Sequence, residues 1–207
     1  MSVTHAPVAG AAPSPVRAAV ALKEWAVAVR ALDAGEQLLI LRKGGISEER
    51  KEFTVEHPEF FLYPTYEHQQ FGQMQARSHD ELTRTLAAPR DPAAVRITNW
   101  ARVADSYPIP ATDEALADAL AAHTLWTPEY IRERLRWRSK KPLYALLLRV
   151  YRLREPRAIP YLPAYGGCKS WLDLDERLVG APVEPVLDDA RFEERAAPLR
   201  ALFRARG

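Results

Sequence analysis

The chain has 207 residues, a formal net charge of +2, 47% hydrophobic residues and 27% charged residues. These values are typical of one soluble globular domain, and no apolar run approaches the ~20 residues that a membrane span needs. The single cysteine, Cys168, excludes an internal disulfide and a cysteine-cluster metal site, so we expect a protein of the reducing cytoplasm.

The first 20 residues are rich in small residues and proline, and they lack the early positive charge and compact apolar core of a secretory signal. We therefore predict a disordered tail over residues 1–20 and a single domain over residues 21–207.

The first half of the domain reads mainly as strands. Apolar runs at Glu24–Leu32 and Gln37–Arg42 flank a short glycine turn, which predicts a hairpin of two buried strands. Short apolar runs at Phe53–Val55 and Phe60–Tyr63 predict two more strands, and Pro64 closes the second of them.

A helix and a strand come next. Ser78 and Glu81 have the spacing of a capping box, which predicts a helix starting there. The run Val95–Val103 alternates with a period of two, so it predicts a strand with Ile97 and Trp100 on opposite faces.

Two helices and a long strand follow. One helix is predicted from Thr112 to about His123, and another after the N-cap Thr127, ending near Trp137. The apolar run Pro142–Leu153 then predicts a strand.

The chain from Asp188 onward predicts one or two short helices, the last of them beginning at Pro198. The elements do not alternate regularly between strand and helix, which argues against a doubly wound parallel sheet. We predict an α+β fold with a mixed, largely antiparallel sheet that can curve towards a barrel, together with several short helices.

Two glycine-containing segments are candidate anion sites. Lys43 precedes Gly44 and Gly45, whose backbone N–H groups can form an anion nest with the lysine as counter-charge. The alternative is a tight turn after a buried strand. Lys169, which follows a second glycine pair, is another possible anion contact. Lys169 could also lower the pKa of the Cys168 thiol, although a buried structural cysteine explains this residue equally.

A polar segment begins where the apolar strand at Phe60–Tyr63 ends. Glu67 and His68 are a carboxylate and an imidazole, the groups that general acid–base catalysis uses. Neighbouring residues on a strand point to opposite faces, so the pair can act on one substrate only if the chain turns after Pro64. The alternative is a polar strand end that satisfies backbone groups. The spacing of the histidines matches no compact metal motif, and we expect neither a metal nor a cofactor.

The stretch from Glu129 to Arg157 has ten basic and three acidic residues, a local net charge of +7, with interleaved aromatic residues. Basic patches with aromatic residues suit phosphate contacts and base stacking, and the alternative is a solvated helix with ordinary core aromatics. The predicted contacts to DNA or RNA are Arg134, Arg138, Lys140 and Lys141 for phosphates, and Trp100 or Trp137 for stacking.

Five segments together resemble a bacterial family of unknown function, the domain of unknown function 1802. They are LKEWA (Leu22–Ala26), LRKGGI (Leu41–Ile46), FFLYPTYEHQ (Phe60–Gln69), LWTPEYIRERLRW (Leu125–Trp137) and GCKSWLDL (Gly167–Leu174). The family has no established activity. Association of some relatives with restriction-endonuclease-like domains implies a role near restriction or DNA defence. This chain carries no convincing nuclease motif, so the resemblance implies binding or sensing of nucleic acid rather than cutting.

Three hypotheses follow from the sequence. The first is a nucleic-acid-binding protein, and the second is an enzyme for a phosphorylated or nucleotide-like small molecule that uses Lys43, Glu67 and His68. The second hypothesis predicts one pocket where LRKGGI and YEHQ converge. The third is a structural interaction module with an exposed apolar patch. The sequence makes no prediction of the oligomeric state.

Overall fold

The computed structural model describes residues 16–43, 57–137, 142–167 and 169–205. Seven strands form one mixed sheet in the order β2-β5-β4-β3-β1-β6, and β7 pairs with β5 outside this path. Only the β1–β3 pairing among the described strands is parallel. The strands are β1 (Val20–Trp25), β2 (Leu39–Arg42), β3 (Glu59–Thr65), β4 (Ala94–Ile109), β5 (Leu143–Pro160), β6 (Trp171–Asp173) and β7 (Val183–Pro185).

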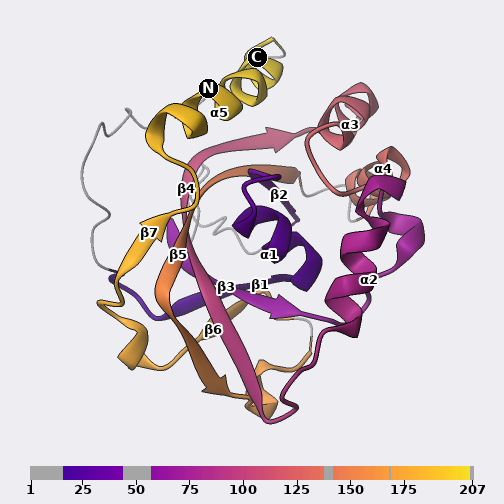
Figure 1. Cartoon of the computed structure of the whole chain (residues 1–207). Coiled ribbons are helices and arrows are strands. Elements are labelled where there is room, and N and C mark those ends of the chain that lie inside the picture. Colours follow the sequence, from indigo (N-terminus) through magenta and orange to yellow (C-terminus); the bar gives the residue numbers. More distant parts are fainter. Residues whose placement is uncertain (1–15, 44–56, 138–141, 168, 206–207) are drawn as a thin grey trace.

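Five α-helices accompany the sheet in the described part of the chain. They are α1 (Ala26–Asp33), α2 (His79–Ala87), α3 (Glu114–Ala121), α4 (Pro128–Arg136) and α5 (Asp189–Arg204). Short 3₁₀ turns occur at Phe71–Gln73, Ala76–Ser78, Pro163–Tyr165 and Glu176–Leu178. The α+β fold with a mixed, largely antiparallel sheet is therefore confirmed. The sheet curves strongly but does not close, because among the described strands β2 and β6 remain its two ends (Figure 1).

Helix α1 lies at the centre of the molecule, with the sheet curved around it and α2, α3 and α4 on one side (Figure 1). Six of its eight residues are buried. One side of the helix, with Val27, Ala28 and Ala31, packs into the core shared with α3, α4 and α5. Its other side, with Val29 and Leu32, packs against residues of the strands β1 to β5. Arg30 is exposed and Asp33 partly exposed, and the rest of the helix is apolar and has to be covered, which explains why the sheet wraps around it.

The prediction of a strand over Glu24–Leu32 is therefore wrong beyond Trp25, because α1 begins at Ala26. A continuous apolar run has no period, so it fits a buried strand and a fully buried helix equally well. The predicted hairpin is replaced by a strand, a buried helix and then β2.

The strands β4 and β5 are longer than predicted, and their pairing shifts register between Ile97 and Asn99. Ile97 and Trp100 pack in the same core cluster, while Ala101 packs in another. The predicted alternation is thus wrong after Thr98, because an irregularity in the pairing moves the following side chains to the other face.

Two helix predictions also need correction. The Ser78 side chain makes no capping hydrogen bond, and Glu81 instead pairs with Arg30 and Arg84, so the capping box does not form. The C-terminal segment is one helix, α5, with Pro198 inside it rather than at its start. The N-caps of α3 and α4 do form: the Asp113 side chain accepts the Leu116 N–H, and that of Thr127 accepts the Tyr130 N–H.

The predicted tail, residues 1–20, falls mostly outside the described residues. Within the described part, Val16 is buried and its carbonyl accepts the N–H of Gly180, and Val20 begins β1. The predicted strand Phe53–Val55 also lies outside the described residues. None of the described helices has the length and apolar character needed to cross a membrane.

A buried polar network holds α1 against the sheet at the register shift. The Asn99 amide donates to the Asp33 carboxylate over 2.8 Å, and the Arg152 Nε donates to the same oxygen over 2.7 Å. Asn99 is completely buried, and its own Oδ1 accepts from the Thr98 hydroxyl. The network anchors the last residue of α1 to β4 and β5.

Replacing Asn99 with leucine should lower the free energy of unfolding by about 2 kcal/mol, because it removes the hydrogen bonds that the completely buried Asn99 side chain makes with Asp33 and Thr98. Urea unfolding followed by circular dichroism measures this change. Arg96→Gln, an exposed substitution on the same strand, is the control and should change stability by less than ~0.5 kcal/mol. Equal stability of N99L and wild type would show that the network does not hold α1.

Candidate functional site

A cleft with a volume of about 260 Å³ opens where the ends of β1, β2 and β3 approach α4 and the loop before β6. We call it the cationic cleft. Its lining residues are Lys23, Glu24, Trp25, Leu41, Arg42, Thr65, Glu67, His68, Trp126, Tyr130, Arg134, Gly167, Lys169 and Ser170.

The five segments that carry the family resemblance meet at this cleft. Each of its lining residues belongs to one of those segments, although the segments are spread from Leu22 to Leu174. LRKGGI and YEHQ were predicted to converge on one pocket. Leu41 and Arg42 of the first segment do line the same cleft as Glu67 and His68 of the second. Gly44 and Gly45 lie outside the described residues.

The polar segment after β3 is fixed to α1 by Gln69. Its side-chain oxygen accepts the N–H of Val27 over 3.2 Å, which satisfies one of the unpaired donors in the first turn of α1. This contact leaves the preceding residues Glu67 and His68 at the rim of the cleft, both exposed. His68 has a φ of 62°, a left-handed conformation that is uncommon outside glycine. The chain thus turns after Pro64, and both side chains can reach one ligand.

Three aromatic residues form one wall of the cleft. The Trp25 and Trp126 rings meet edge to face with centroids 4.7 Å apart, and the Tyr130 ring lies 5.3 Å from Trp126. Trp126 is buried, whereas Trp25 and Tyr130 are only partly covered. The buried indole therefore supports two rings whose surfaces remain partly accessible.

Positive charge exceeds negative charge in the cleft. Its lining contains four cationic residues and two carboxylates, not counting His68. Arg134 donates to the Tyr130 hydroxyl and the Leu41 carbonyl over 3.3 Å each, and its buried Nε has no hydrogen-bond partner. A buried donor without an acceptor is uncommon in proteins, and this one is itself covered by surrounding atoms.

The loop before β6 is attached to β1 by a lysine. The Lys23 ammonium donates to the carbonyls of Tyr165 and Gly167 over 2.5 and 2.9 Å, and the Lys23 N–H donates to the Ser170 carbonyl. These contacts place the exposed side chain of Lys169 at the rim of the cleft.

A buried ion pair forms the floor of the cleft. Glu24 is only 8% exposed, and one of its oxygens accepts the N–H of Trp25 over 2.8 Å. The other lies 3.6 Å from Arg42, which also donates to the Lys23 carbonyl. Burial lowers the pKa of Arg42, and Glu24 acts in the opposite direction by favouring its charged form.

Lys43 has a different role from the one predicted. Its ammonium donates to the carbonyls of Arg134 and Leu135 over 2.9 and 2.5 Å, at the end of α4. A cation there satisfies free carbonyls and complements the helix dipole. Burial, followed by repulsion from Arg134, lowers the pKa of Lys43. Lys43 therefore stabilises the helix that carries Arg134 and does not line the cleft.

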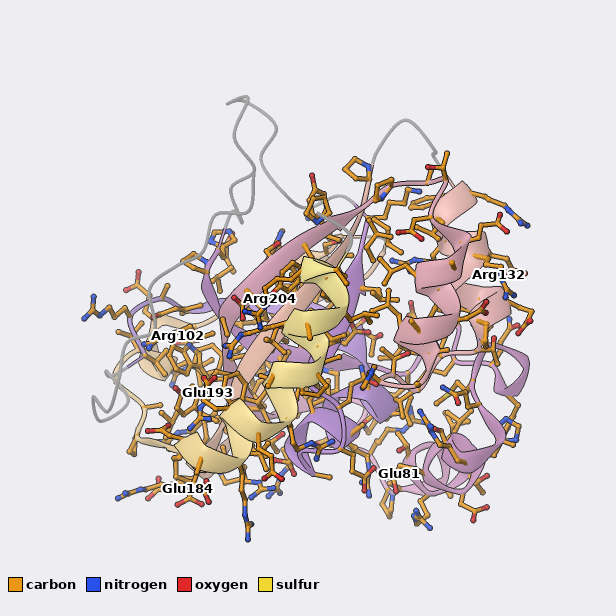
Figure 2. All side chains as sticks on the ribbon, turned by 90° about the horizontal axis from the view of Figure 1, so that it is seen from above. Glu81, Arg102, Arg132, Glu184, Glu193 and Arg204 are labelled. Carbon is orange, nitrogen blue, oxygen red and sulfur yellow. The ribbon has the colours of Figure 1, made fainter. Side chains whose placement is uncertain are left out.

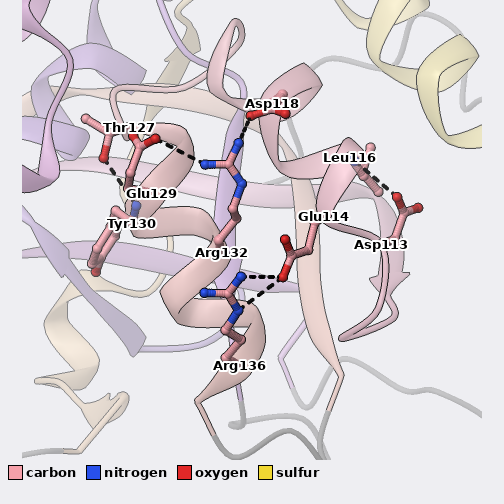
Figure 3. A network of polar contacts seen from close by, with 9 residues as sticks. All are labelled: Asp113, Glu114, Leu116, Asp118, Thr127, Glu129, Tyr130, Arg132 and Arg136. Carbon is pink, nitrogen blue, oxygen red and sulfur yellow. Dashed lines mark hydrogen bonds and ion pairs between the residues drawn. The ribbon is translucent and has the colours of Figure 1, made fainter.

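Five arginines in the described part of the predicted basic stretch form ion pairs, four of them with acidic residues from other elements. Arg132 pairs with Asp118 and Glu129, and Arg136 pairs with Glu114 over 2.5 Å (Figure 3). In β5, Arg149 pairs with Asp189, Arg152 with Asp33 and Arg157 with Glu155. In Figure 2, Arg132 of this stretch lies on the opposite side of the view from Arg102, with Arg204 of α5 between them. The local charge of +7 therefore does not form a continuous basic patch among the described residues.

The other predicted contacts divide into three groups. Trp100 is completely buried, so its ring is not accessible for stacking on a ligand. Trp137 is 51% exposed but does not line the cationic cleft. Arg138, Lys140 and Lys141 lie outside the described residues, as does Cys168. Of the residues predicted for phosphate binding, Arg134 and Lys169 come together with Glu67 and His68 in the cleft.

Sequence reasoning missed Lys23, Glu24 and Trp25 of β1 and the pair Trp126 and Tyr130. Their residue types did not indicate a functional site, because such residues are common at the end of a strand and at the start of a helix. A signal was nevertheless present, since all five lie in LKEWA and LWTPEYIRERLRW, segments that carry the resemblance. Among the described residues, no group of three or more His, Cys, Asp or Glu side chains is arranged to hold a metal ion.

The comparisons with known proteins come from three sources. A family model described as "Domain of unknown function (DUF1802)" matches residues 21–198. No curated protein matches the sequence. Two solved structures match the chain: the ASCH protein from Zymomonas mobilis and a point mutant of it, each with a TM-score of 0.40 and 12% identity. The mutant match covers 80% of this chain and 94% of the other, and the wild-type match covers 77% and 89%. Similarity of this degree carries no argument about function.

The left-handed backbone of His68 gives a testable expectation for the cleft rim. His68→Val should lower the free energy of unfolding by about 1–2 kcal/mol, because a β-branched residue is strained at positive φ, whereas His68→Gly should leave it within ~1 kcal/mol of wild type or raise it. Gln70→Val is the matched control, since Gln70 is exposed with extended backbone at φ −127°. Thermal unfolding of the three variants measures the difference, and equal behaviour of H68V and Q70V would contradict it.

Proposed function

The chain belongs to the DUF1802 family, and we propose that it binds single-stranded nucleic acid by taking one nucleotide into the cationic cleft. One observation carries this proposal: the cleft joins accessible aromatic rings to an excess of cations. A nucleotide has the matching pair of features, a flat aromatic base and an anionic phosphate.

Stacking supports the proposal through the aromatic wall. Trp25 and Tyr130 are partly covered, and the buried Trp126 fixes both in place. Base stacking on such rings contributes about 1–3 kcal/mol per base and tolerates different sequences.

Charge supports it through Lys169 and Arg134. The exposed Lys169 at the rim is placed to contact a phosphate, and the guanidinium of Arg134 lines the cleft with weak contacts of 3.3 Å each to the protein. Because the basic residues around Arg132 and Arg136 are ion-paired, the cleft is a better phosphate site than the helix surface next to it.

Size favours a single strand over a duplex. A volume of about 260 Å³ is close to the lower end of small-molecule sites, ~300–1,000 Å³. Such a cleft fits one base with part of its sugar, which a paired and stacked duplex does not expose. An accessory role in restriction or DNA defence remains a prediction from the family resemblance alone.

An enzyme for a nucleotide-like small molecule is the second candidate, because Glu67 and His68 line the same cleft. Their side chains would transfer protons, while Lys43 contacts the carbonyls at the end of α4 and does not line the cleft. Incubation of wild-type protein and of the E67Q variant with nucleotides, followed by chromatography of the products, tests this candidate. The convergence of polar groups in one cleft favours both candidates over a structural module.

Lys169→Gln should weaken binding of a short single-stranded oligonucleotide about fivefold at low salt, equivalent to ~1 kcal/mol. It should also reduce the slope of log K against log salt concentration by about 0.7–1, because one phosphate contact is lost. Fluorescence anisotropy with DNA and RNA oligonucleotides at several salt concentrations measures both effects.

Arg154→Gln is the matched control, since Arg154 is an exposed cation of the predicted basic stretch outside the cleft. It should bind like wild type. Loss of binding in R154Q with normal binding in K169Q would place the contact surface on β5 instead of the cleft. Absence of salt-dependent binding by the wild-type protein would refute the proposed function.

A further inference from the structure

The floor of the cationic cleft contains an acceptor that phosphate binding does not explain. Glu24 is more than nine-tenths buried, yet it lines a cleft whose other charges favour anions. One of its oxygens accepts a single backbone N–H, and the other faces Arg42 at 3.6 Å, beyond hydrogen-bond distance. An ionised carboxylate has about four lone-pair positions, so Glu24 retains capacity to accept further N–H donors.

A donor group lies beside this acceptor. Arg134 donates to the carbonyl of Leu41, the residue before Arg42, so the Arg134 guanidinium and the Glu24–Arg42 pair form one cluster at the cleft. The contacts of the Arg134 Nη1 with Tyr130 and of its Nη2 with Leu41, at 3.3 Å each, are weak, so both groups can turn to a ligand. The cluster therefore presents a guanidinium fork next to a carboxylate, under a wall of aromatic rings.

The four common bases differ in how they match this arrangement. Guanine presents two adjacent N–H donors, N1–H and the N2 amino group, and next to them the acceptors O6 and N7. Adenine and cytosine have one amino group each, and uracil places carbonyl oxygens on both sides of its single N–H. An arginine fork pairs with guanine O6 and N7, and a carboxylate can accept both guanine donors.

We propose that the cationic cleft selects guanine, with Glu24 accepting from N1–H and N2–H and Arg134 donating to O6 and N7. This inference rests on the proposed function, because it names the base that the same cleft receives. Glu24 would thus have two roles: it balances the charge of Arg42, and it sets the specificity of the site.

Binding of nucleoside 5′-monophosphates to the full-length protein tests the proposal, with the change in tryptophan fluorescence as the signal. Guanosine monophosphate should bind at least about tenfold more tightly than the adenosine, cytidine and uridine monophosphates, the size expected for one good bidentate pair. Inosine monophosphate, which lacks only the N2 amino group, should bind about fivefold more weakly than guanosine monophosphate.

The variant Glu24→Gln removes one acceptor and adds a donor. It should reduce the preference for guanosine over inosine monophosphate to less than about twofold, a ratio that a general loss of stability would not change. Urea unfolding shows whether E24Q is folded, and if it is not, the guanosine-to-inosine ratio of the wild-type protein decides the question alone.

Two negative results can be told apart. Equal affinities for the guanosine, inosine, adenosine, cytidine and uridine monophosphates would overturn guanine selection and leave the proposed function standing. Absence of binding by any monophosphate and by single-stranded oligonucleotides would overturn both.

Discussion

The fold depends on one constraint, the burial of a short and mostly apolar helix. Helix α1 directly follows β1, and six of its eight residues are buried, whereas Arg30 is exposed and Asp33 partly exposed. Since a helix about 10–12 Å wide has to be covered on most of its sides, a flat sheet cannot satisfy it. The strands β4 and β5 are long enough to curve around it, and α2, α3, α4 and α5 complete the cover (Figure 1). The register shifts in β4 and β5 are where such curvature is accommodated.

The same constraint determines where the cleft forms. Because α1 starts at the end of β1, its first turn leaves unpaired N–H groups at the edge of the core, and Gln69 satisfies one of them. That contact draws the segment after β3 towards the end of β1 and turns the backbone at His68. The hydrogen bond from the Val27 N–H to Gln69 thus explains why polar residues directly follow the buried strand β3. Glu67 and His68 are placed at the cleft as a consequence.

Much of the fold could be predicted from local patterns, and the failures have identifiable causes. The N-cap of α4 at Thr127 was predicted correctly because its signal is contained in a few neighbouring residues. The helix α1 and the faces of β4 were not, because an all-apolar run has no period and a register shift depends on the partner strand. The Ser78 capping box failed through a tertiary contact, since Arg30 of α1 attracts Glu81 away from the helix start.

Part of the candidate site could also be predicted, but only residue by residue. Arg134, Lys169, Glu67 and His68 were identified by chemical type, and the structure brings them together. Accessibility and charge balance were not predictable, because both depend on elements distant in sequence. Trp100 was predicted to be available for stacking but lies inside the core, while Trp25 was placed in a buried strand and Tyr130 was counted only among the aromatic residues of the basic stretch.

Charge balance explains why the cleft, and not the most basic stretch of the sequence, is the better candidate site. Asp118 and Glu114 of α3 pair with the arginines of α4, and acidic residues of α1 and α5 pair with those of β5 (Figure 3). Exposed ion pairs of this kind contribute little to stability, ~0–1 kcal/mol each, but they remove the local excess of positive charge. In the cleft the excess persists, because four cationic residues face two carboxylates in a partly desolvated space. A lower effective dielectric strengthens the attraction of that excess for an anion, so the proposed phosphate would be held more strongly there than on the surrounding surface.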